Sequence, residues 1–87
     1  MATTFKIVLT PAARRSLQSL PRNVVRRIDA KILALGQNPR PHGVKKLHGD
    51  DGFLRVRAGD YRIIYCVEDD RLTVLIVRIG HRREIYR

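Results

Sequence analysis

The hydrophobic positions of the N-terminal half change period after a short strand-like segment. Residues 5–9 (FKIVL) are mostly apolar and rich in β-branched side chains, which predicts a strand. Thr10 then offers a helix N-cap, and Pro11 suits the first helical position because its missing N–H is not needed there. The apolar residues that follow repeat at helical spacing, so we expect a helix that ends at about Leu20, where Pro21 interrupts it.

A second helical pattern begins near Pro21 and places its apolar residues on one stripe. The members of that stripe are Val25, Ile28, Ile32 and Leu35. Its opposite face is basic and carries Arg22, Arg26 and Lys31. Gly36 is well placed to end the helix, and residues 38–43 (NPRPHG) are typical of a turn-rich loop. The first half of the chain is therefore predicted to be a strand followed by a basic helical hairpin.

In the C-terminal half, apolar and polar residues alternate with the two-residue period of a strand. Residues 53–57 alternate, with Leu54 and Val56 on one side and Arg55 and Arg57 on the other. Short turns at residues 59–60 and 68–71 join three such segments, which predicts an antiparallel meander. The order β-α-α-β-β-β indicates one α+β domain over residues 1–87, with both helices packed on one sheet face.

Charge changes this picture more than overall composition does. The 87 residues include 18 Lys and Arg but only 8 Asp and Glu, which gives a net charge of +10. Lys is confined to Lys6, Lys31, Lys45 and Lys46, so most of the charge is guanidinium, whose planar fork suits phosphate. Nucleic acid is the first partner to expect, an acidic protein the second and an anionic membrane surface the third. The alternative is a merely solvated basic surface.

Several classes of function find no support in the residues. Cys66 is the only cysteine, which rules out an internal disulfide and favours the cytoplasm. The N-terminus does not have the pattern of a signal peptide, and no apolar stretch approaches transmembrane length. There is no phosphate-binding glycine-rich loop, and His42, His48 and His81 are scattered. We therefore expect neither a metal nor another cofactor, and no membrane partner.

A row of arginines on adjacent predicted strands is the strongest candidate site. Arg55 and Arg57 share one face of their strand, and Arg62 begins the next strand across the tight turn. The meander also brings the segment after Gly80 to the same end of the sheet. Convergent cations repel one another unless an anion binds between them. The alternative is a solvated face that carboxylates such as Asp60 partly neutralise.

Two motifs give this pattern a family resemblance. Residues 54–65 (LRVRAGDYRIIY) and residues 80–86 (GHRREIY) resemble, in order and separation, the RelE branch of the RelE/ParE toxin superfamily. The likeness covers nearly the whole chain, including the first strand and the basic hairpin. It implies a small ribonuclease that enters the ribosomal A site, cuts the mRNA codon there, and is held inactive by an antitoxin.

The resemblance also implies a role for each matching residue. Arg55 and Arg62 would hold and neutralise the scissile phosphate. Arg82 would assist the leaving 5′-oxygen, and Tyr86 would help to remove the 2′-hydroxyl proton. One position departs from the pattern: Phe53 stands where some members have Lys, and it either stacks on a base or packs at the core or sheet edge.

The chemistry of these residue types agrees with such roles. Attack of the 2′-oxygen on its own phosphate builds charge on a pentavalent phosphorane, which fixed guanidinium groups stabilise more than the ground state. Tyrosine, with an ordinary pKa near 10, is a poor base until neighbouring cations favour its phenolate. Because an arginine holds its proton firmly, Arg82 is better suited to electrostatic stabilisation than to proton donation. The expected product is a 2′,3′-cyclic phosphate, formed without metal once the ribosome has aligned the RNA.

Other basic side chains are expected to contact RNA rather than to act in the reaction. They are Lys45, Lys46, Arg57, His81 and Arg83. The two lysines lie beside His48 in what we expect to be an exposed loop that touches the RNA backbone. His81 is equally consistent with a structural role at the strand end, and Glu84 with a local ion pair rather than a base.

Three partners and two rival functions follow from these assignments. We expect ribosomal RNA to meet the basic hairpin, mRNA to meet the sheet, and an acidic or amphipathic RelB-like antitoxin to cover this surface by strand addition or as a helix in a groove. One rival is a ParE-like inhibitor of DNA gyrase, which needs no convergence of Arg62, Arg82 and Tyr86. The other is a non-catalytic RNA-binding module.

Overall fold

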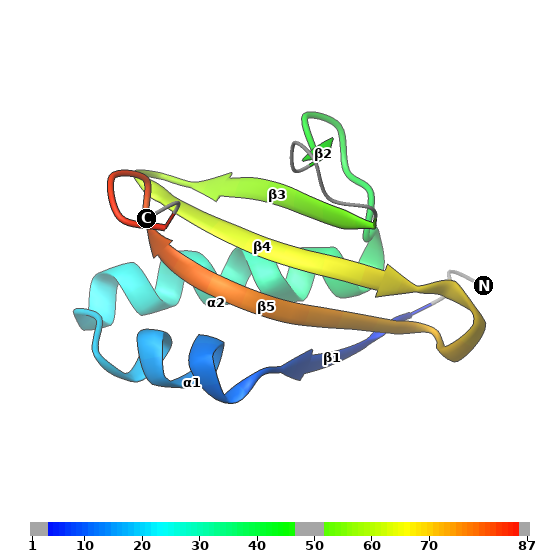
Figure 1. The fold of residues 1–87 in the computed structure, drawn as a ribbon, viewed down its shortest axis with the longest axis horizontal. Coiled ribbons are helices and arrows are strands. Elements are labelled where there is room, and N and C mark those ends of the chain that lie inside the picture. The colour runs from blue at the N-terminus through cyan, green and yellow to red at the C-terminus, as the bar shows by residue number, and fades with distance from the viewer. Residues whose placement is uncertain (1–3, 47–51, 86–87) are drawn as a thin grey trace.

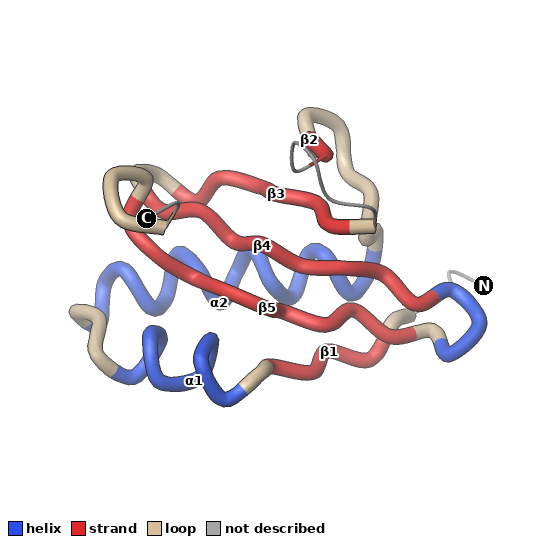
Figure 2. The backbone as a smooth tube through the Cα atoms, viewed as in Figure 1, coloured by secondary structure: helices blue, strands red, loops and turns tan. Residues whose placement is uncertain are grey.

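Residues 4–46 and 52–85 are described by the computed structural model, and they form a five-stranded mixed sheet with two α-helices (Figures 1 and 2). The elements in chain order are β1 (Lys6–Leu9), α1 (Pro11–Gln18), α2 (Arg22–Gln37), β2 (Lys45–Lys46), β3 (Phe53–Ala58), β4 (Tyr61–Glu68), a 3-10 turn (Asp69–Arg71) and β5 (Thr73–His81). The strand order across the sheet is β1-β5-β4-β3-β2. The predicted α+β class and the β3-β4-β5 meander are confirmed.

Both helices cover the same face of the sheet, as Figure 1 shows. The buried core lies between them and the sheet and is built mainly from α2, β4 and β5. Its largest fully buried side chains are Tyr65, Ile28, Leu35, Ile63, Ile76 and Val74. At the start of α1, the Thr10 hydroxyl accepts a hydrogen bond from the Ala13 amide (3.1 Å) and donates one to the Val77 carbonyl (2.8 Å). The predicted cap therefore also ties α1 to β5.

Two details of the sequence prediction are wrong. Gly36 does not end α2, which continues to Gln37. Gly36 is instead buried where α2 approaches β1: the Phe5 amide donates to the Gly36 carbonyl at 2.8 Å, and an added Cβ would lie 3.2 Å from the Phe5 carbonyl oxygen. Lys45 and Lys46, expected in a loop, form the short edge strand β2. Both differences arise from contacts with segments distant in sequence.

The face of the sheet opposite the helices is apolar near its middle and basic toward one end. Four residues paired in register form what we call the apolar row: Val8 on β1, Leu75 on β5, Cys66 on β4 and Phe53 on β3. Phe53 is half-buried and starts β3 on this face, so it packs at the sheet surface rather than in the core cluster. Burial raises the pKa of the Cys66 thiol, so Cys66 remains a neutral member of the row.

In the portion of the chain that the structure describes, the helices are too short or too polar to cross a lipid bilayer.

Candidate anion-binding site

A basic pocket opens between β2, β3 and β4, and we call it the arginine pocket. Its lining residues are Gly43, Lys45, Arg55, Val56, Arg57 and Arg62. The cavity measures about 130 Å³, which is large enough for one phosphate group and its nearest waters. Four of the six lining residues are cationic, and no described residue in the lining carries a carboxylate.

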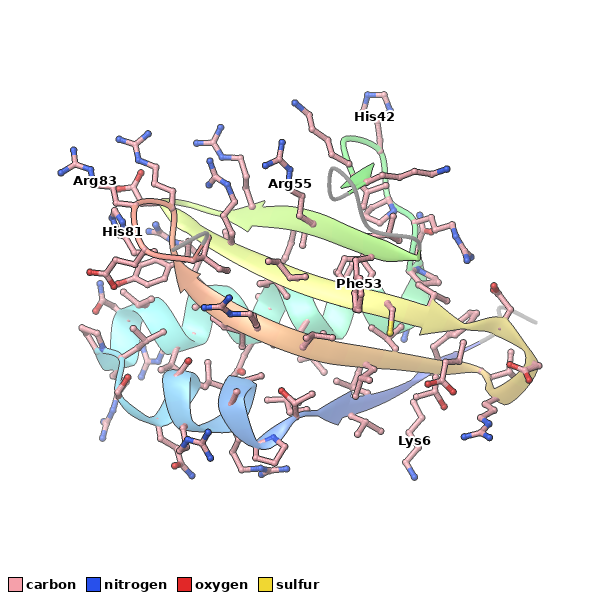
Figure 3. All side chains as sticks on the ribbon, in the orientation of Figure 1. Lys6, His42, Phe53, Arg55, His81 and Arg83 are labelled. Carbon is pink, nitrogen blue, oxygen red and sulfur yellow. The ribbon has the colours of Figure 1, made fainter. Side chains whose placement is uncertain are left out.

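Strand register explains why these cations meet. On adjacent antiparallel strands, Lys45 is paired with Arg55, and Arg57 is paired with Arg62. Residues paired in this way project to the same face with their Cβ atoms about 5 Å apart. Figure 3 shows Arg55 extending from β3 past the edge of that strand, away from β4. The side chains that alternate with them, Val56 and Ala58, are buried in the core.

Arg62 is the most constrained cation of the arginine pocket. Its Nη1 atom is buried and has no hydrogen-bond partner among the described residues. Its side chain also stands opposite that of Arg57, and like charges facing each other across a strand pair are destabilising. A buried donor without an acceptor costs free energy. A bound anion would remove both penalties, so the pocket is suited to receive one.

The turn after β5 places three further predicted residues at the neighbouring end of the sheet. The Arg82 amide donates to the Asp60 carbonyl at 2.9 Å, and Arg82 Nε lies 3.9 Å from Asp60 Oδ1. His81 packs edge-to-face on Tyr61, with ring centroids 5.5 Å apart, and its Nδ1 accepts a hydrogen bond from the Arg83 amide at 3.1 Å. Figure 3 shows Arg83 at this corner, directed away from the sheet.

The structure thus divides the predicted residues into two groups. Arg55, Arg62, Arg57 and Lys45 line the arginine pocket. His81 ends β5, Arg82 and Arg83 belong to the turn that follows it, and none of the three is in the lining of the arginine pocket. Lys46 is exposed on β2. Tyr86 and His48 lie outside the described residues, so the role of Tyr86 stays a prediction.

Sequence patterns missed one cation at this end of the sheet. Arg27 of α2 reaches the β3–β4 turn, where a Cβ added at Gly59 would lie 2.6 Å from Arg27 Nη1. Gly59 also has a φ of +64°, which favours glycine. Nothing in the helical pattern distinguishes Arg27 from the other basic residues of α2, because its position depends on how α2 crosses the sheet.

A second cavity, of about 310 Å³, lies between α1, the end of β5 and the C-terminal turn. Its polar lining includes Ser16, Arg78 and Glu84, so one guanidinium is offset by one carboxylate. The arginine pocket, with four cations and no carboxylate among its described lining residues, is therefore the stronger anion site.

Fold and pocket together define a small basic α+β protein with a phosphate-sized cationic site on the sheet face that the helices do not cover. Comparison with known proteins identifies the family to which this protein belongs. Residues 7–86 match the model of the ParE toxin of the type II toxin–antitoxin system parDE. Two toxins of Mycobacterium tuberculosis are similar over 95% of this chain: RelG, at 31% identity over 97% of its length, and RelE, at 33% identity over 87% of its length.

Solved structures agree with these matches. The archaeal RelE–RelB complex from Pyrococcus horikoshii aligns with a TM-score of 0.80 and 30% identity, covering 93% of this chain and 98% of that one. The RelBE2 toxin–antitoxin complex from M. tuberculosis aligns with a TM-score of 0.83 and 28% identity, covering 97% and 98%. The chain therefore belongs to the RelE/ParE family of toxins from type II toxin–antitoxin systems.

Proposed function

We propose that this toxin is an endoribonuclease that cleaves mRNA in the ribosomal A site. The observation that carries the proposal is the arginine pocket, in which four cations line a space of about 130 Å³ and one of them, Arg62, has a buried Nη1 with no hydrogen-bond partner among the described residues. A gyrase inhibitor of the ParE type needs no such convergence of cations. The similarity to toxins named RelE and RelG supports the same choice.

In the proposed reaction, Arg55 and Arg62 hold the scissile phosphate in the arginine pocket. The 2′-oxygen of the upstream ribose attacks phosphorus, the bond to the 5′-oxygen breaks, and a 2′,3′-cyclic phosphate forms. Negative charge grows on the equatorial oxygens in the transition state, where guanidinium groups already in place stabilise it without reorganisation. Arg57 and Lys45 complete the cationic lining and contact the backbone on either side.

Arg82 and Tyr86 serve the two oxygens that change protonation. Arg82 is held at the corner of the sheet by the Asp60 carbonyl, and Tyr86 follows it by four positions in the sequence. Its fixed charge stabilises the leaving 5′-oxygen, which takes its proton from water, while the phenolate form of Tyr86 accepts the 2′-hydroxyl proton. A tyrosine near several guanidinium groups ionises more readily, because these cations favour the phenolate. Even when it is activated in this way, tyrosine is a weak base. This weakness accounts for a requirement that the ribosome align the substrate.

Contacts outside the arginine pocket place the toxin on the ribosome. The exposed basic faces of α1 and α2 suit the phosphates of ribosomal RNA. Lys46, His81 and Arg83 lie on the same open edge and corner as the pocket and suit the mRNA backbone. These residues position the RNA, whereas the ribosome fixes which codon is presented.

The same surface suits an antitoxin of the RelB type. RelE–RelB complexes are among the structural neighbours, and this chain has a net charge of +10 that favours an acidic partner. The apolar row on the open face gives an amphipathic segment an apolar strip beside the arginines. An antitoxin bound there would cover the arginine pocket and prevent entry to the A site.

The proposal is tested by in vitro translation with the purified toxin, with the mRNA ends mapped by primer extension. Wild type is expected to cut within the A-site codon, whereas Arg62→Ala, Arg82→Ala and Tyr86→Phe are expected to leave the mRNA intact. Arg71→Ala is the control, since it removes the same charge from the turn at the opposite end of the sheet.

Two outcomes would replace the proposal. Intact mRNA together with arrested gyrase and DNA damage after expression would assign the chain to the ParE type. Toxicity that persists in Arg82→Ala and Tyr86→Phe, with no mRNA cleavage by wild type and RNA affinity reduced only in proportion to lost charge, would indicate a non-catalytic RNA-binding module.

A further inference from the structure

One wall of the arginine pocket comes from a segment with little secondary structure of its own. Residues 38–46, which we call the wall loop, follow α2 and include β2 at their end. They supply Gly43 and Lys45 to the pocket. Among the described residues, strand β2 is two residues long and pairs with β3 at Arg55 and Leu54. So short a ladder is a weak anchor, and the position of Lys45 must depend on other contacts.

Two contacts fix the wall loop to the far end of the sheet. The Arg40 guanidinium donates two hydrogen bonds to the Asp69 carboxylate, Nη1 to Oδ1 at 3.1 Å and Nη2 to Oδ2 at 2.8 Å. One residue earlier, the buried Pro39 carbonyl accepts a hydrogen bond from the Tyr65 hydroxyl at 2.6 Å. Asp69 belongs to the turn after β4 and Tyr65 to β4 itself, so both contacts join the loop to one strand.

The geometry of the ion pair is directional. Two parallel N–H···O bonds orient a guanidinium relative to a carboxylate, which a single contact between point charges does not do. The Asn38 side chain adds a local turn, with Oδ1 accepting from the Arg40 amide at 3.2 Å. The hydrogen bonds from the Arg40 guanidinium to the Asp69 carboxylate are the main reason that the pKa of Asp69 lies below its ordinary value. The pair is therefore charged at neutral pH.

We propose that Arg40, Asp69 and Tyr65 are positioning residues that hold Lys45 at the arginine pocket and so set its affinity for a phosphodiester. The inference rests on the proposed function for its substrate, but the affinity can be measured apart from cleavage. An exposed ion pair contributes little to global stability. A loop that must be ordered when the ligand binds weakens binding instead, since the ordering cost is then part of the binding free energy.

Asp69 and Asp70 provide a matched pair of variants. Both are exposed acids of the same 3-10 turn, and Asp70 makes no hydrogen bond or ion pair with any described residue. Asp69→Asn and Asp70→Asn each remove one negative charge, which by itself makes an RNA site slightly stronger. If Asp69 positions the wall loop, Asp69→Asn is instead expected to weaken RNA binding, with a loss of roughly three- to tenfold in affinity, and Asp70→Asn is not.

The binding probe is a five-nucleotide RNA with 2′-O-methyl riboses, which cannot undergo the cyclising attack. Its affinity is measured by NMR titration, together with hydrogen exchange of the amides of the wall loop. Asp69→Asn is expected to weaken binding and to speed exchange in residues 39–46, while Asp70→Asn does neither. The doubly reversed Arg40→Asp/Asp69→Arg protein keeps the wild-type net charge and is expected to recover most of the affinity.

Cleavage kinetics on ribosomes separate this inference from the proposed function. The inference predicts that Asp69→Asn raises KM and leaves kcat within about twofold of wild type. Equal affinities and equal loop exchange in Asp69→Asn and Asp70→Asn would overturn it, whatever the wild type does on ribosomes. A wild type that fails to cleave, with RNA binding still weakened only by Asp69→Asn, would retain the positioning residues and overturn the nuclease.

Discussion

Replacing Arg62 with methionine is expected to make the protein more stable and much less active. In the absence of a bound anion, the Nη1 atom of Arg62 is buried without a hydrogen-bond partner among the described residues, and the guanidinium faces Arg57 across the β3–β4 pair. Methionine keeps an unbranched stem of similar length and removes both features. The site therefore holds an unfavourable arrangement that a bound anion would relieve.

The expected size of the effect follows from the two penalties. An unsatisfied buried donor costs about 1–3 kcal/mol, and a like-charged cross-strand pair about 0.2–1 kcal/mol. Arg62 is only half-buried, so part of the first penalty is already relieved by water at its other nitrogens. We expect Arg62→Met to gain roughly 1–2 kcal/mol, which for a domain of this size raises Tm by about 4–8 °C per kcal/mol.

Thermal denaturation followed by circular dichroism measures this gain in a low-salt buffer without multivalent anions. Arg26→Met, on an exposed position of α2, is the control for the loss of one positive charge. Added sulfate is expected to stabilise wild type by RT ln(1 + [L]/Kd) and Arg62→Met much less. The reasoning fails if Arg62→Met is less stable than wild type and sulfate raises both Tm values equally. In the ribosomal assay, the variant is expected to lose about 10²- to 10³-fold in kcat.

Three further predictions concern the fold around the site. Gly59→Ala should cost roughly 1–2 kcal/mol in urea unfolding because its φ is positive, and adding Arg27→Ala should recover only the part due to the clash with Arg27. Burial raises the pKa of Tyr65 to about 12, above its unfolded value near 10. Tyr65 therefore stabilises the fold fully below pH 10 and loses that contribution as pH rises toward 12, so the slope of stability against pH in this window should shrink in Tyr65→Phe. Thr10→Ala should cost about 1–2 kcal/mol, since it removes both the cap and the bond to β5, while Thr10→Ser should cost less than half of that.

Local pattern was enough to predict the elements that carry the site. Alternation in residues 53–57 separated Val56, which is buried, from Arg55 and Arg57, which line the arginine pocket. The tight turn at Gly59 then dictated that Arg62 would face the same side, because residues paired across an antiparallel hairpin share a face. These inferences depend on period and turn length alone, so they needed no knowledge of distant contacts.

The long-range arrangement could not be predicted in the same way. The sequence predicts a strand at residues 5–9 but does not say that β1 lies parallel to β5 at the sheet edge. Because α2 crosses that strand closely, Gly36 is an interior contact of the helix and not its end. A separate contact of α2, with the β3–β4 turn, brings Arg27 to Gly59.

The sequence by itself therefore determined which side chains alternate, where α1 begins, and that a positively charged sheet face would form beside a basic hairpin. Only the tertiary structure decided which cations share one cavity and what holds its wall in place. Arg40 and Asp69 are 29 positions apart, and neither has a local pattern that marks it as half of a pair. Periodicity records each residue's relation to its own element, whereas a pocket depends on how separate elements pack against one another.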